Sequence, residues 1–426
     1  MEGIHKIHFI GVGGIGMSAL ARHLKQEKKI VSGSDRSLSP ITKQLSRERI
    51  QIFGEQVAEN ITKDIDLVIY TEAMSKDHPE MEAARALHIP MMNYFEALSV
   101  AMNPYYLIAV SGTHGKTTTT AMITDIFEAA EKDPTAVIGS LRSKTKSNYR
   151  AGKSKYAVVE ACEYKKDFLH LTPDVLVITN IELDHTDFYP TLAQVQSAFR
   201  EMIGRVNEGG VVVTDASHGN ILPVLKDFTG TIIDYKKFLD LELPLKHPGL
   251  HNRQNAAAAK AVAKHEKVAN DTIDEALKSY AGTWRRFEFK GDLNGAPVYD
   301  DYAHHPTAIK ATLEATREAY PDRRIVAVFQ PHTYTRTVAL FKDFAKSFAR
   351  ADEVILLPIY AAREQNTTGV NSRELAVAAL EYAPNTRYLD SLPLALDELR
   401  RTITKNDVLI IMGAGDVTKL ADALTA

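Results

Sequence analysis

The sequence predicts an α/β protein of three units, each built on a mostly parallel sheet. Three observations indicate this class. Short apolar runs alternate with helical patterns along most of the chain, as expected for parallel strands joined by helices. Two of these runs end in glycine-bearing loops, at residues 11–16 and 112–116. The length of 426 residues also exceeds the roughly 100–200 residues of a single domain.

The composition argues against several classes of partner. With 45% hydrophobic residues, 25% charged residues and a net charge of −3, the chain has no general attraction for nucleic acid or for an anionic membrane. No apolar run approaches the roughly 18–20 residues of a membrane span, and the N-terminus does not resemble a secretion signal. Cys162 is the only cysteine, so no intrachain disulfide can form. We therefore expect a cytoplasmic protein that binds neither nucleic acid nor membrane.

The first unit begins with a strand and a glycine loop. Residues 5–10 read as a strand, residues 11–16 match G-x-G-x-x-G, and a helical pattern begins at Met17. A second strand ends at Asp35. In a dinucleotide fingerprint this arrangement places a pyrophosphate at the helix N-terminus and a ribose hydroxyl on the acid. The alternative is a glycine-rich turn that only helps the helix pack on the strand.

The remainder of the first unit continues the alternation. Residues 66–70 and 90–92 are predicted strands, and residues 79–87 and 95–102 are predicted helices. The dipeptide Asn103-Pro104 follows and is the best first boundary. We therefore expect residues 1–103 to form one unit.

A phosphate-binding loop opens the second unit. An apolar strand at residues 106–110 leads into Ser-Gly-Thr-His-Gly-Lys-Thr and then into a helical pattern. Gly112 and Gly115 let the backbone N–H groups face an anion at the helix N-terminus. Lys116 can reach the β- and γ-phosphates of a nucleotide, and Thr117 can offer a hydroxyl to Mg²⁺. The alternative is an ordinary strand-to-helix turn.

Two further strands deliver polar groups to the same edge. Residues 155–161 carry Glu160 at their end, and residues 174–180 are followed by His185. Because ligands gather beyond the carboxyl ends of parallel strands, these groups are expected near the phosphate loop, where they suit Mg²⁺. The alternatives are a helix-capping role for Glu160 and a polar core position for His185.

Two later segments of this unit can contact a nucleotide. A strand at residues 209–213 precedes an alanine-rich helix, and His251, Asn252 and Asn255 stand at its first turn. They can bind adenine or ribose, or Asn252 can cap the helix. After a helix at residues 271–280, Arg285 and Arg286 can clamp a phosphate or form a solvated face.

The third unit, residues 289–426, repeats the α/β alternation. A hairpin turn is predicted at Asn294-Gly295, followed by a dense polar cluster at residues 298–306. Strands are predicted at 324–329, 353–357 and 407–412, a loop at 330–336, a helix at 339–348, and a final helix after Gly-Ala-Gly-Asp. Residues 104–288 are therefore expected to form the second unit.

The motifs, taken together, resemble those of the Mur ligases of peptidoglycan synthesis. The matching segments are GVGGIGMS, SGTHGKTTTT, EACE, TNIELDH, HN-x-x-NA, RRF, DDYAHHPT, FQPHTYTR and GAGD, in that order along nearly the whole chain. They look most like the branch that adds L-alanine to UDP-N-acetylmuramate. The later-acting branches of the family have a lysine at the position of Phe199. The phenylalanine in this chain therefore also fits the alanine-adding branch.

The resemblance implies an architecture and a reaction. It implies an N-terminal Rossmann-like domain that binds a UDP-sugar, a central P-loop ATPase-type domain with a mostly parallel sheet, and a C-terminal Rossmann-like domain that binds an amino acid. ATP would phosphorylate the lactoyl carboxylate of UDP-N-acetylmuramate, and the amine of L-alanine would attack the acyl phosphate. ATP and Mg²⁺ are the implied cofactors, and the enzyme is expected to be a monomer or homodimer.

The resemblance also assigns roles to residues. The implied catalytic residues are Lys116, Glu160, His185, His332 and Arg336. The implied ATP-binding residues are Gly112, Thr113, His114, Gly115, Lys116, Thr117, Thr118, His251, Asn252, Asn255, Arg286 and Asp301. The implied magnesium ligands are Thr117, Glu160 and His185. The implied substrate-binding residues are Gly13, Gly14, Ile15, Gly16, Ser18, Asp35, Thr71, Tyr302, His304, His332 and Arg336.

Several positions depart from the family pattern. Glu55 stands where a histidine is common, Cys162 replaces an acid beside the metal residues, and Thr333 replaces an arginine in the amino-acid pocket. Ala303 and Ala308 also differ, and the segment between residues 213 and 248 is short.

Three other functions compete with an alanine-adding ligase. A recycling ligase would attach a preformed peptide to the same UDP-sugar and would need a wider amino-acid pocket. An NAD-dependent oxidoreductase would explain residues 9–35 but would leave the Gly-Lys-Thr loop without a role. A regulatory nucleotide-binding protein that has lost turnover would explain the departures at Glu55, Cys162 and Thr333.

Overall fold

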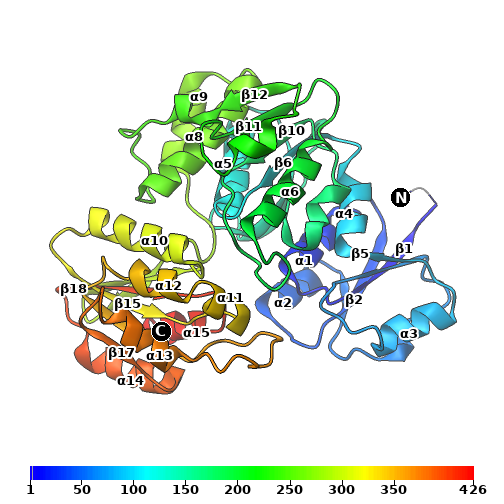
Figure 1. Cartoon of the computed structure of the whole chain (residues 1–426). Coiled ribbons are helices and arrows are strands. Elements are labelled where there is room, and N and C mark those ends of the chain that lie inside the picture. Colours follow the sequence, from blue (N-terminus) through cyan, green and yellow to red (C-terminus); the bar gives the residue numbers. More distant parts are fainter. Residues whose placement is uncertain (2) are drawn as a thin grey trace.

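The computed structural model describes residue 1 and residues 3–426 and arranges them around three sheets (Figure 1). The N-terminal sheet and its helices, in blue, lie beside the central sheet, in cyan and green, and the C-terminal sheet, in yellow to red, lies on its other side. The sheets are mostly parallel, so the predicted α/β class is confirmed. Within the described part of the chain, no helix combines the length and the apolar character that a bilayer crossing requires.

The first sheet has five parallel strands in the order β3-β2-β1-β4-β5. The chain runs from β1 to β2 and β3 on one side and then returns to β4 on the other side of β1. In open α/β sheets, a crevice that binds ligands forms at the carboxyl end of the strand where the order reverses in this way. The strands are β1 (Lys6–Ile10), β2 (Ile30–Ser34), β3 (Gln51–Phe53), β4 (Leu67–Tyr70) and β5 (Met91–Asn93). The helices are α1 (Ile15–Gln26), α2 (Pro40–Arg47), the 3-10 helix η1 (Ala58–Asn60), α3 (Pro79–Ala86) and α4 (Tyr94–Met102).

The second sheet has seven strands in the order β12-β11-β10-β6-β9-β7-β8, and only β7 and β8 pair antiparallel. Here β10 and β9 flank β6, which makes a second crevice of the same kind. The strands are β6 (Tyr106–Ser111), β7 (Thr135–Arg142), β8 (Ser147–Arg150), β9 (Tyr156–Glu160), β10 (Val175–Ile178), β11 (Val211–Thr214) and β12 (Thr231–Asp234). The helices are α5 (Lys116–Ala129), η2 (Tyr164–His170), α6 (Leu192–Ile203), α7 (Leu222–Leu225), η3 (Tyr235–Phe238), α8 (Leu250–His265) and α9 (Asn270–Ser279).

The third sheet has six strands in the order β13-β14-β18-β15-β16-β17, with an antiparallel hairpin at one edge. The predicted turn of that hairpin is confirmed, because Asn294 and Gly295 have φ of +53° and +83°. The strands are β13 (Glu288–Leu293), β14 (Ala296–Asp301), β15 (Arg324–Phe329), β16 (Glu353–Leu356), β17 (Thr386–Tyr388) and β18 (Asp407–Met412). The helices are α10 (Pro306–Ala319), α11 (Tyr334–Ala339), α12 (Phe341–Ser347), α13 (Ser372–Ala379), α14 (Leu392–Thr402) and α15 (Thr418–Leu424).

Some element boundaries differ from the predictions. Helix α1 begins at Ile15, ahead of Met17, because the loop tightens directly into the helix. The helix predicted over 339–348 is observed as α12, and Leu340, where φ is −113° and leaves the helical range, separates it from the unpredicted helix α11. The loop predicted at 330–336 is correspondingly shorter, since α11 already begins at Tyr334.

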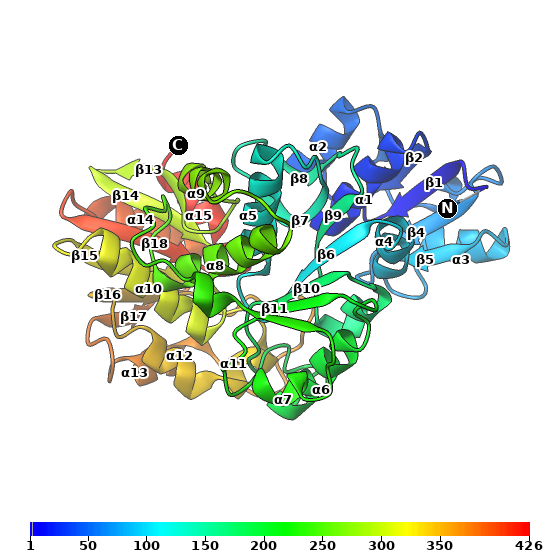
Figure 2. The same ribbon diagram turned by 90° about the horizontal axis from the view of Figure 1, so that it is seen from above.

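Helix α1 joins the first sheet to the second. It lies against β7 and β8, as Figure 2 shows. The fully buried amide of Asn148 on β8 accepts a hydrogen bond from Arg22 Nη1 at 2.7 Å and donates one to Ser18 Oγ at 3.0 Å. Arg22 Nε also donates to Glu48 at 2.7 Å. Apolar packing continues through this contact, because one buried cluster includes Phe9 of the first sheet and residues of the second.

Replacing Asn148 with alanine should destabilise the protein. The change leaves buried donors of Arg22 without a partner, which costs roughly 1–3 kcal/mol of unfolding free energy. Urea unfolding followed by circular dichroism measures it. Thr145→Ala, an exposed change on the same hairpin, is the matched control. Equal unfolding free energies for the two variants would contradict the prediction.

Candidate active site

The glycine loop between β6 and α5 has the geometry of an anion-binding loop. Gly112 and Gly115 have φ of +129° and +84°, which favour glycine. A Cβ atom would lie 2.1 Å from Thr179 Oγ1 at the first position and 2.3 Å from Asn255 Oδ1 at the second. Gly115 directly precedes α5, so the loop amides and the positive end of the helix face the same space. The two glycines are thus required by the backbone conformation of the loop.

Lys116 forms a buried ion pair with Glu163. Glu163 is not among the site residues predicted from the sequence. Lys116 Nζ donates to Glu163 Oε2 at 2.9 Å and to Thr113 O at 3.3 Å. Burial alone would lower the pKa of Lys116, but the carboxylates of Glu163 and Glu160 outweigh it and raise the pKa. The lysine is therefore a fixed cation in the loop. The signal that could have identified Glu163 is its place in the Glu-Ala-Cys-Glu motif directly after β9.

The three predicted strand ends meet at one edge of the sheet. Strands β10, β6 and β9 are neighbours, so Thr117, Glu160 and His185 all lie at their carboxyl ends. Glu160 accepts a hydrogen bond from Gly139 N at 2.9 Å, so it does not cap a helix. His185 Nε2 lies 3.8 Å from Glu163 Oε1, and Asn180 Oδ1 accepts from His114 N at 2.9 Å.

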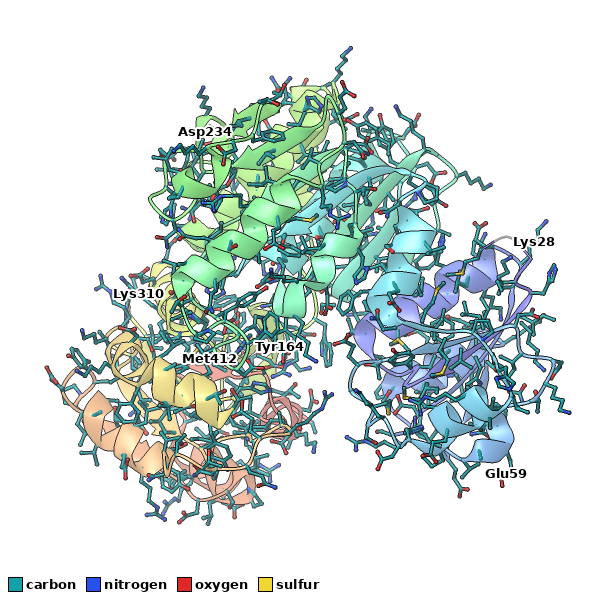
Figure 3. All side chains as sticks on the ribbon, turned by 45° about the vertical axis from the view of Figure 1, so that its right-hand side comes forward. Lys28, Glu59, Tyr164, Asp234, Lys310 and Met412 are labelled. Carbon is teal, nitrogen blue, oxygen red and sulfur yellow. The ribbon has the colours of Figure 1, made fainter. Side chains whose placement is uncertain are left out.

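The donor groups of this edge fit Mg²⁺. Burial lowers the pKa of His185, so its ring is neutral and can act as a ligand. Thr117 and Glu160 supply a hydroxyl and a carboxylate oxygen, which are the hard donors that Mg²⁺ prefers. Tyr164 stacks obliquely over His185 with ring centroids 4.6 Å apart. It lies where the central and C-terminal parts meet (Figure 3).

The first turn of α8 packs against the glycine loop and the start of α5. Gly249, with φ of +98°, caps the helix, so the capping role considered for Asn252 is wrong; Asn252 instead donates to Pro248 O at 2.8 Å. Asn255 lies under Gly115, with its Oδ1 3.3 Å from Thr119 Oγ1. Burial lowers the pKa of His251 to about 4, so that its ring is neutral.

The two adjacent arginines have different surroundings. Arg285 is buried and donates to Asp300 at 3.1 Å, so it belongs to the interior of the C-terminal part and neither clamps a phosphate nor forms a solvated face. Arg286 reaches the glycine loop, with its Nη2 3.4 Å from Thr117 Oγ1, and stacks over Tyr302 at 5.0 Å. Only Arg286 is therefore placed to contact a phosphate.

Asp301 lies beneath this arginine. Its carboxylate accepts hydrogen bonds from Phe287 N at 2.8 Å and from Ala303 N at 2.7 Å. Burial raises the pKa of Asp301 to about 6, although Arg286 opposes that shift. The carboxylate thus holds the two segments that carry Arg286 and Tyr302.

The predicted amino-acid pocket residues gather around Arg336. Arg336 Nε donates to Asp184 Oδ1 at 2.8 Å, and its Nη1 lies 3.2 Å from His332 Nδ1. His304 lies beside His332, with ring centroids 6.0 Å apart, and beside Tyr302 at 5.2 Å. The cluster therefore joins α11 to the segment after β10.

The partner of Arg336, Asp184, is not among the residues predicted from the sequence. Burial would raise the pKa of Asp184, but Arg336 and the neighbouring histidines outweigh it and hold that pKa well below its usual range. Asp184 is therefore a buried anion that orients the guanidinium. The Leu-Asp-His sequence before His185 was the available signal, but it does not reveal which cation lies opposite.

The N-terminal glycine loop is organised by Asp35. Its carboxylate accepts from Gly13 N at 2.9 Å and from Ser37 N at 3.0 Å. Thr71 lies on the other side of the loop, 2.6 Å from where a Cβ of Gly11 would be. Gly14 is exposed and Ile15 is half-buried, so the tip of the loop is accessible. These are the positions at which the sequence predicts binding of the UDP-sugar.

Two members of the N-terminal set have packing roles. A Cβ on Gly16 would lie 2.6 Å from Tyr94 Oη, so this glycine allows α1 to approach α4. Ser18 is fully buried and donates to Ile15 O at 2.9 Å. Its hydroxyl also accepts from Asn148, so it has no accessible surface for a substrate.

The positions that depart from the family pattern are also resolved in space. Phe199 is fully buried against Phe168, with ring centroids 5.3 Å apart. Strand β9 ends at Glu160, so Cys162 lies in the loop after the strand. Burial raises the pKa of Cys162 to about 12, which makes the thiol a poor nucleophile. Thr333 precedes α11 with φ of +66°, and Glu55 is exposed.

Three family models match consecutive parts of the chain. They are the "Mur ligase family, catalytic domain" over residues 6–106, the "Mur ligase middle domain" over 110–237, and the "Mur ligase, glutamate ligase domain" over 285–415. These matches correspond to the three sheets and include both glycine loops.

Individual proteins match over the full length. The UDP-N-acetylmuramate–L-alanine ligase of Agathobacter rectalis is 40% identical, over 98% of this chain and 97% of its own. The crystal structure of the UDP-N-acetylmuramate–alanine ligase of Thermotoga maritima has a TM-score of 0.82 at 30% identity, over 98% of each chain. A murein peptide ligase of Psychrobacter arcticus has a TM-score of 0.72 at 25% identity, over 99% of each chain. With matches of this length and identity, carried by the same loops that form the site, the chain belongs to the Mur ligase family.

Proposed function

We propose that the protein joins L-alanine to the lactoyl carboxylate of UDP-N-acetylmuramate in peptidoglycan synthesis, with conversion of ATP to ADP and phosphate. One observation carries this proposal: the segment after β10 joins the glycine loop to Arg336, because Glu182 N donates to Thr113 Oγ1 at 2.8 Å and Asp184 accepts from Arg336 at 2.8 Å. A phosphate-binding loop and a site for a carboxylate are therefore close together. The names of the full-length relatives support the same reaction.

ATP occupies the glycine loop of the central part in this proposal. The backbone N–H groups at residues 115–117, at the start of α5, and the charge of Lys116 bind its phosphates, and Arg286 contacts them from the C-terminal side. His251, Asn252 and Asn255 lie on the side of the adenosine. Thr117, Glu160 and His185 would hold Mg²⁺, whose charge offsets the repulsion between phosphate and carboxylate oxygens.

The UDP-sugar extends from the first sheet to this loop. Its diphosphate lies at the loop that Asp35 supports, and its lactoyl carboxylate approaches the γ-phosphate beside Lys116. Attack by a carboxylate oxygen on the phosphorus forms the acyl phosphate and releases ADP. The ion pair with Glu163 keeps Lys116 in place before ATP arrives.

L-Alanine binds between the two reacting centres. Arg336, oriented by Asp184, pairs with its carboxylate, and Tyr302, His304 and His332 enclose the remainder. The free amine then attacks the acyl carbon, and phosphate leaves. Burial and the neighbouring Arg336 lower the pKa of His332 to about 4, so this ring is neutral and its Nδ1 accepts from Arg336 Nη1 at 3.2 Å. The proton that the amine loses leaves with the phosphate.

The location of the protein and its oligomeric state are also proposals. The reaction consumes ATP, and we place it in the cytoplasm, where ATP is available. A monomer or homodimer is sufficient, because the residues of the site all come from one chain. The oxidoreductase alternative loses its support, since the full-length relatives are named as ligases.

Replacing Lys116 with alanine should abolish formation of the acyl phosphate. The change removes the cation beside the γ-phosphate, which should slow this step on the order of a hundredfold or more. Trapping of the acyl phosphate with hydroxylamine measures the step. Binding of UDP-N-acetylmuramate, measured by calorimetry, should remain nearly intact. Lys310→Ala, an exposed change on α10, is the control, and loss of both properties in Lys116→Ala would mean that the two sites are not separate.

Replacing Arg336 with lysine should raise the KM for L-alanine by about tenfold or more, because an ammonium group cannot bind a carboxylate in two places while it contacts Asp184. The KM for ATP should not change. Steady-state phosphate release measures both constants, with the exposed Arg363→Lys as control. An unchanged KM for alanine would remove Arg336 from the pocket.

A peptide-adding ligase is the second candidate, because the murein peptide ligase of Psychrobacter arcticus matches the chain over 99% of its length. Purified protein is incubated with ATP and UDP-N-acetylmuramate and with either L-alanine or a tripeptide, and phosphate is measured. We expect release with alanine only. Release with tripeptide alone would replace the proposed function, and no release with either would favour the regulatory alternative.

A further inference from the structure

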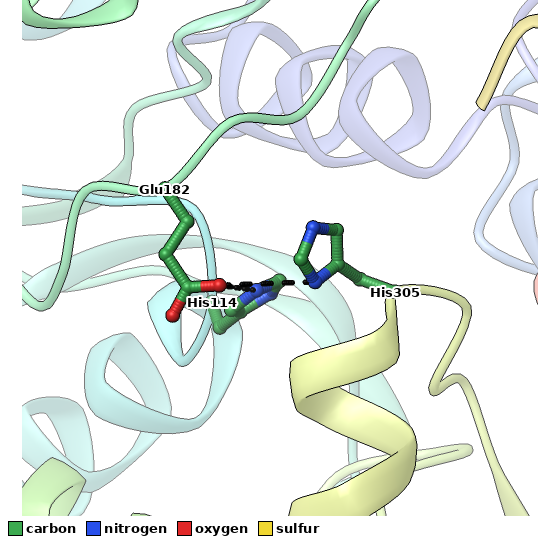
Figure 4. A group of neighbouring side chains, drawn as sticks. All are labelled: His114, Glu182 and His305. Atoms are coloured by element: carbon green, nitrogen blue, oxygen red, sulfur yellow. Dashed lines mark ion pairs between the residues drawn. The ribbon is translucent and has the colours of Figure 1, made fainter. Parts of the chain in front are cut away.

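Three side chains meet at the junction of the central and C-terminal parts, outside the proposed magnesium site. His114 belongs to the glycine loop, Glu182 follows β10, and His305 directly precedes α10 (Figure 4). One nitrogen or oxygen atom of each lies within 4.8 Å of the others. Glu182 Oε2 is 3.6 Å from His114 Nε2 and 3.8 Å from His305 Nδ1.

These distances are longer than direct hydrogen bonds and suit a shared ligand. His114 Nε2 is buried and makes no hydrogen bond with any described residue. A buried polar atom without a partner is costly, and such atoms call for an explanation. Ligand atoms about 2.0–2.1 Å from a tetrahedral zinc ion are roughly 3.3 Å apart, so modest side-chain rotations bring the three atoms to a common ion.

The surroundings fix each group in the form that binds a metal. His305 Nε2 lies 3.1 Å from Leu183 O, which makes this nitrogen the donor and Nδ1 the acceptor. Nδ1 caps α10 by accepting from Thr307 N at 3.3 Å and lies 3.8 Å from Glu182 Oε2, so binding of an ion would compete with this cap. Thr307 Oγ1 donates to Glu182 Oε2 at 2.6 Å. Such outer hydrogen bonds orient the ligands in metal sites. Burial and the nearby His114 lower the pKa of His305 to about 4, so its ring is neutral at pH 7.

The backbone of His114 is also fixed. Its N–H donates to Asn180 Oδ1 at 2.9 Å, and its carbonyl accepts from Asn180 Nδ2 at 3.0 Å. The imidazole can therefore turn only about its own side-chain bonds. Little ordering of the backbone is needed for it to reach an ion, which favours affinity.

We propose that His114, Glu182 and His305 bind one divalent transition-metal ion of the zinc class, which joins the glycine loop to the C-terminal part. Two imidazoles and one carboxylate suit zinc-class ions, whereas Mg²⁺ prefers oxygen ligands. Three protein ligands leave a fourth position open. This site goes beyond the proposed ligase reaction and does not depend on it.

Cobalt(II) is the probe that tests the site. The full-length protein is titrated with Co²⁺ in the presence of excess Mg²⁺ and without nucleotide, and visible absorption is recorded. A site with few ligands gives an intense band, whereas hydrated, octahedral Co²⁺ absorbs weakly. We expect a band that saturates at one equivalent and disappears when Zn²⁺ is added. Absence of the band would overturn the proposal.

Four variants locate the bound ion. His305→Asn retains a good helix cap for α10, and Glu182→Gln retains the shape of the side chain. Both should weaken Co²⁺ binding on the order of tenfold or more. His185→Gln, at the magnesium site, and His170→Gln, at an exposed position, should retain the wild-type dissociation constant. Circular dichroism checks the folding of each variant.

Each remaining outcome decides against the site. If the band persists at wild-type affinity in His305→Asn or Glu182→Gln, the ion does not join the two parts. If it disappears in His185→Gln, the ion lies at the proposed magnesium residues instead. The readout is spectroscopic, so loss of ligase activity in any variant does not affect the result.

Discussion

The buried ion pair between Arg336 and Asp184 is the interaction on which the composite site depends. It joins α11 of the C-terminal part to the segment after β10, with both side chains almost fully buried. Removing one member of such a pair costs about 3–5 kcal/mol, since the other charge is left without a partner. The pair also places the pocket residues His332 and His304 opposite the edge that carries Lys116. Together with the contacts of Thr307 and His305 to the same segment, it fixes how the two halves of the site lie.

Much of the fold could be predicted from the sequence because its signals are local. Apolar runs that end in glycine loops define β1 and β6 and the helices that follow, and the turn at Asn294 and Gly295 defines a hairpin. The gathering of the proposed magnesium ligands at one edge could also be predicted, since the carboxyl ends of neighbouring parallel strands must meet. Glu160 and His185 lie there for that reason alone.

The partners of these groups could not be predicted in the same way. Glu163 and Asp184 are acids in recognisable motifs, but only tertiary packing brings them against Lys116 and Arg336. Arg285 and Arg286 look equivalent in sequence, and a backbone φ of +57° at Arg285 helps to turn the two side chains into different surroundings. The role of Ser18 could not be predicted either, because Ser18 lies beside the glycine fingerprint in the sequence but packs against Asn148 of another sheet. Long-range contacts decide these roles.

The segment from Glu182 to His185 is held from the opposite part of the molecule at three successive points. Thr307 binds Glu182 at 2.6 Å, His305 binds the carbonyl of Leu183 at 3.1 Å, and Arg336 binds Asp184 at 2.8 Å. His185 is the next residue. Any rotation of the C-terminal sheet away from the central sheet must therefore release this segment and loosen the imidazole. Such a rotation would disturb the proposed magnesium ligand and the adjoining glycine loop together, which would link release of the products to separation of the two parts.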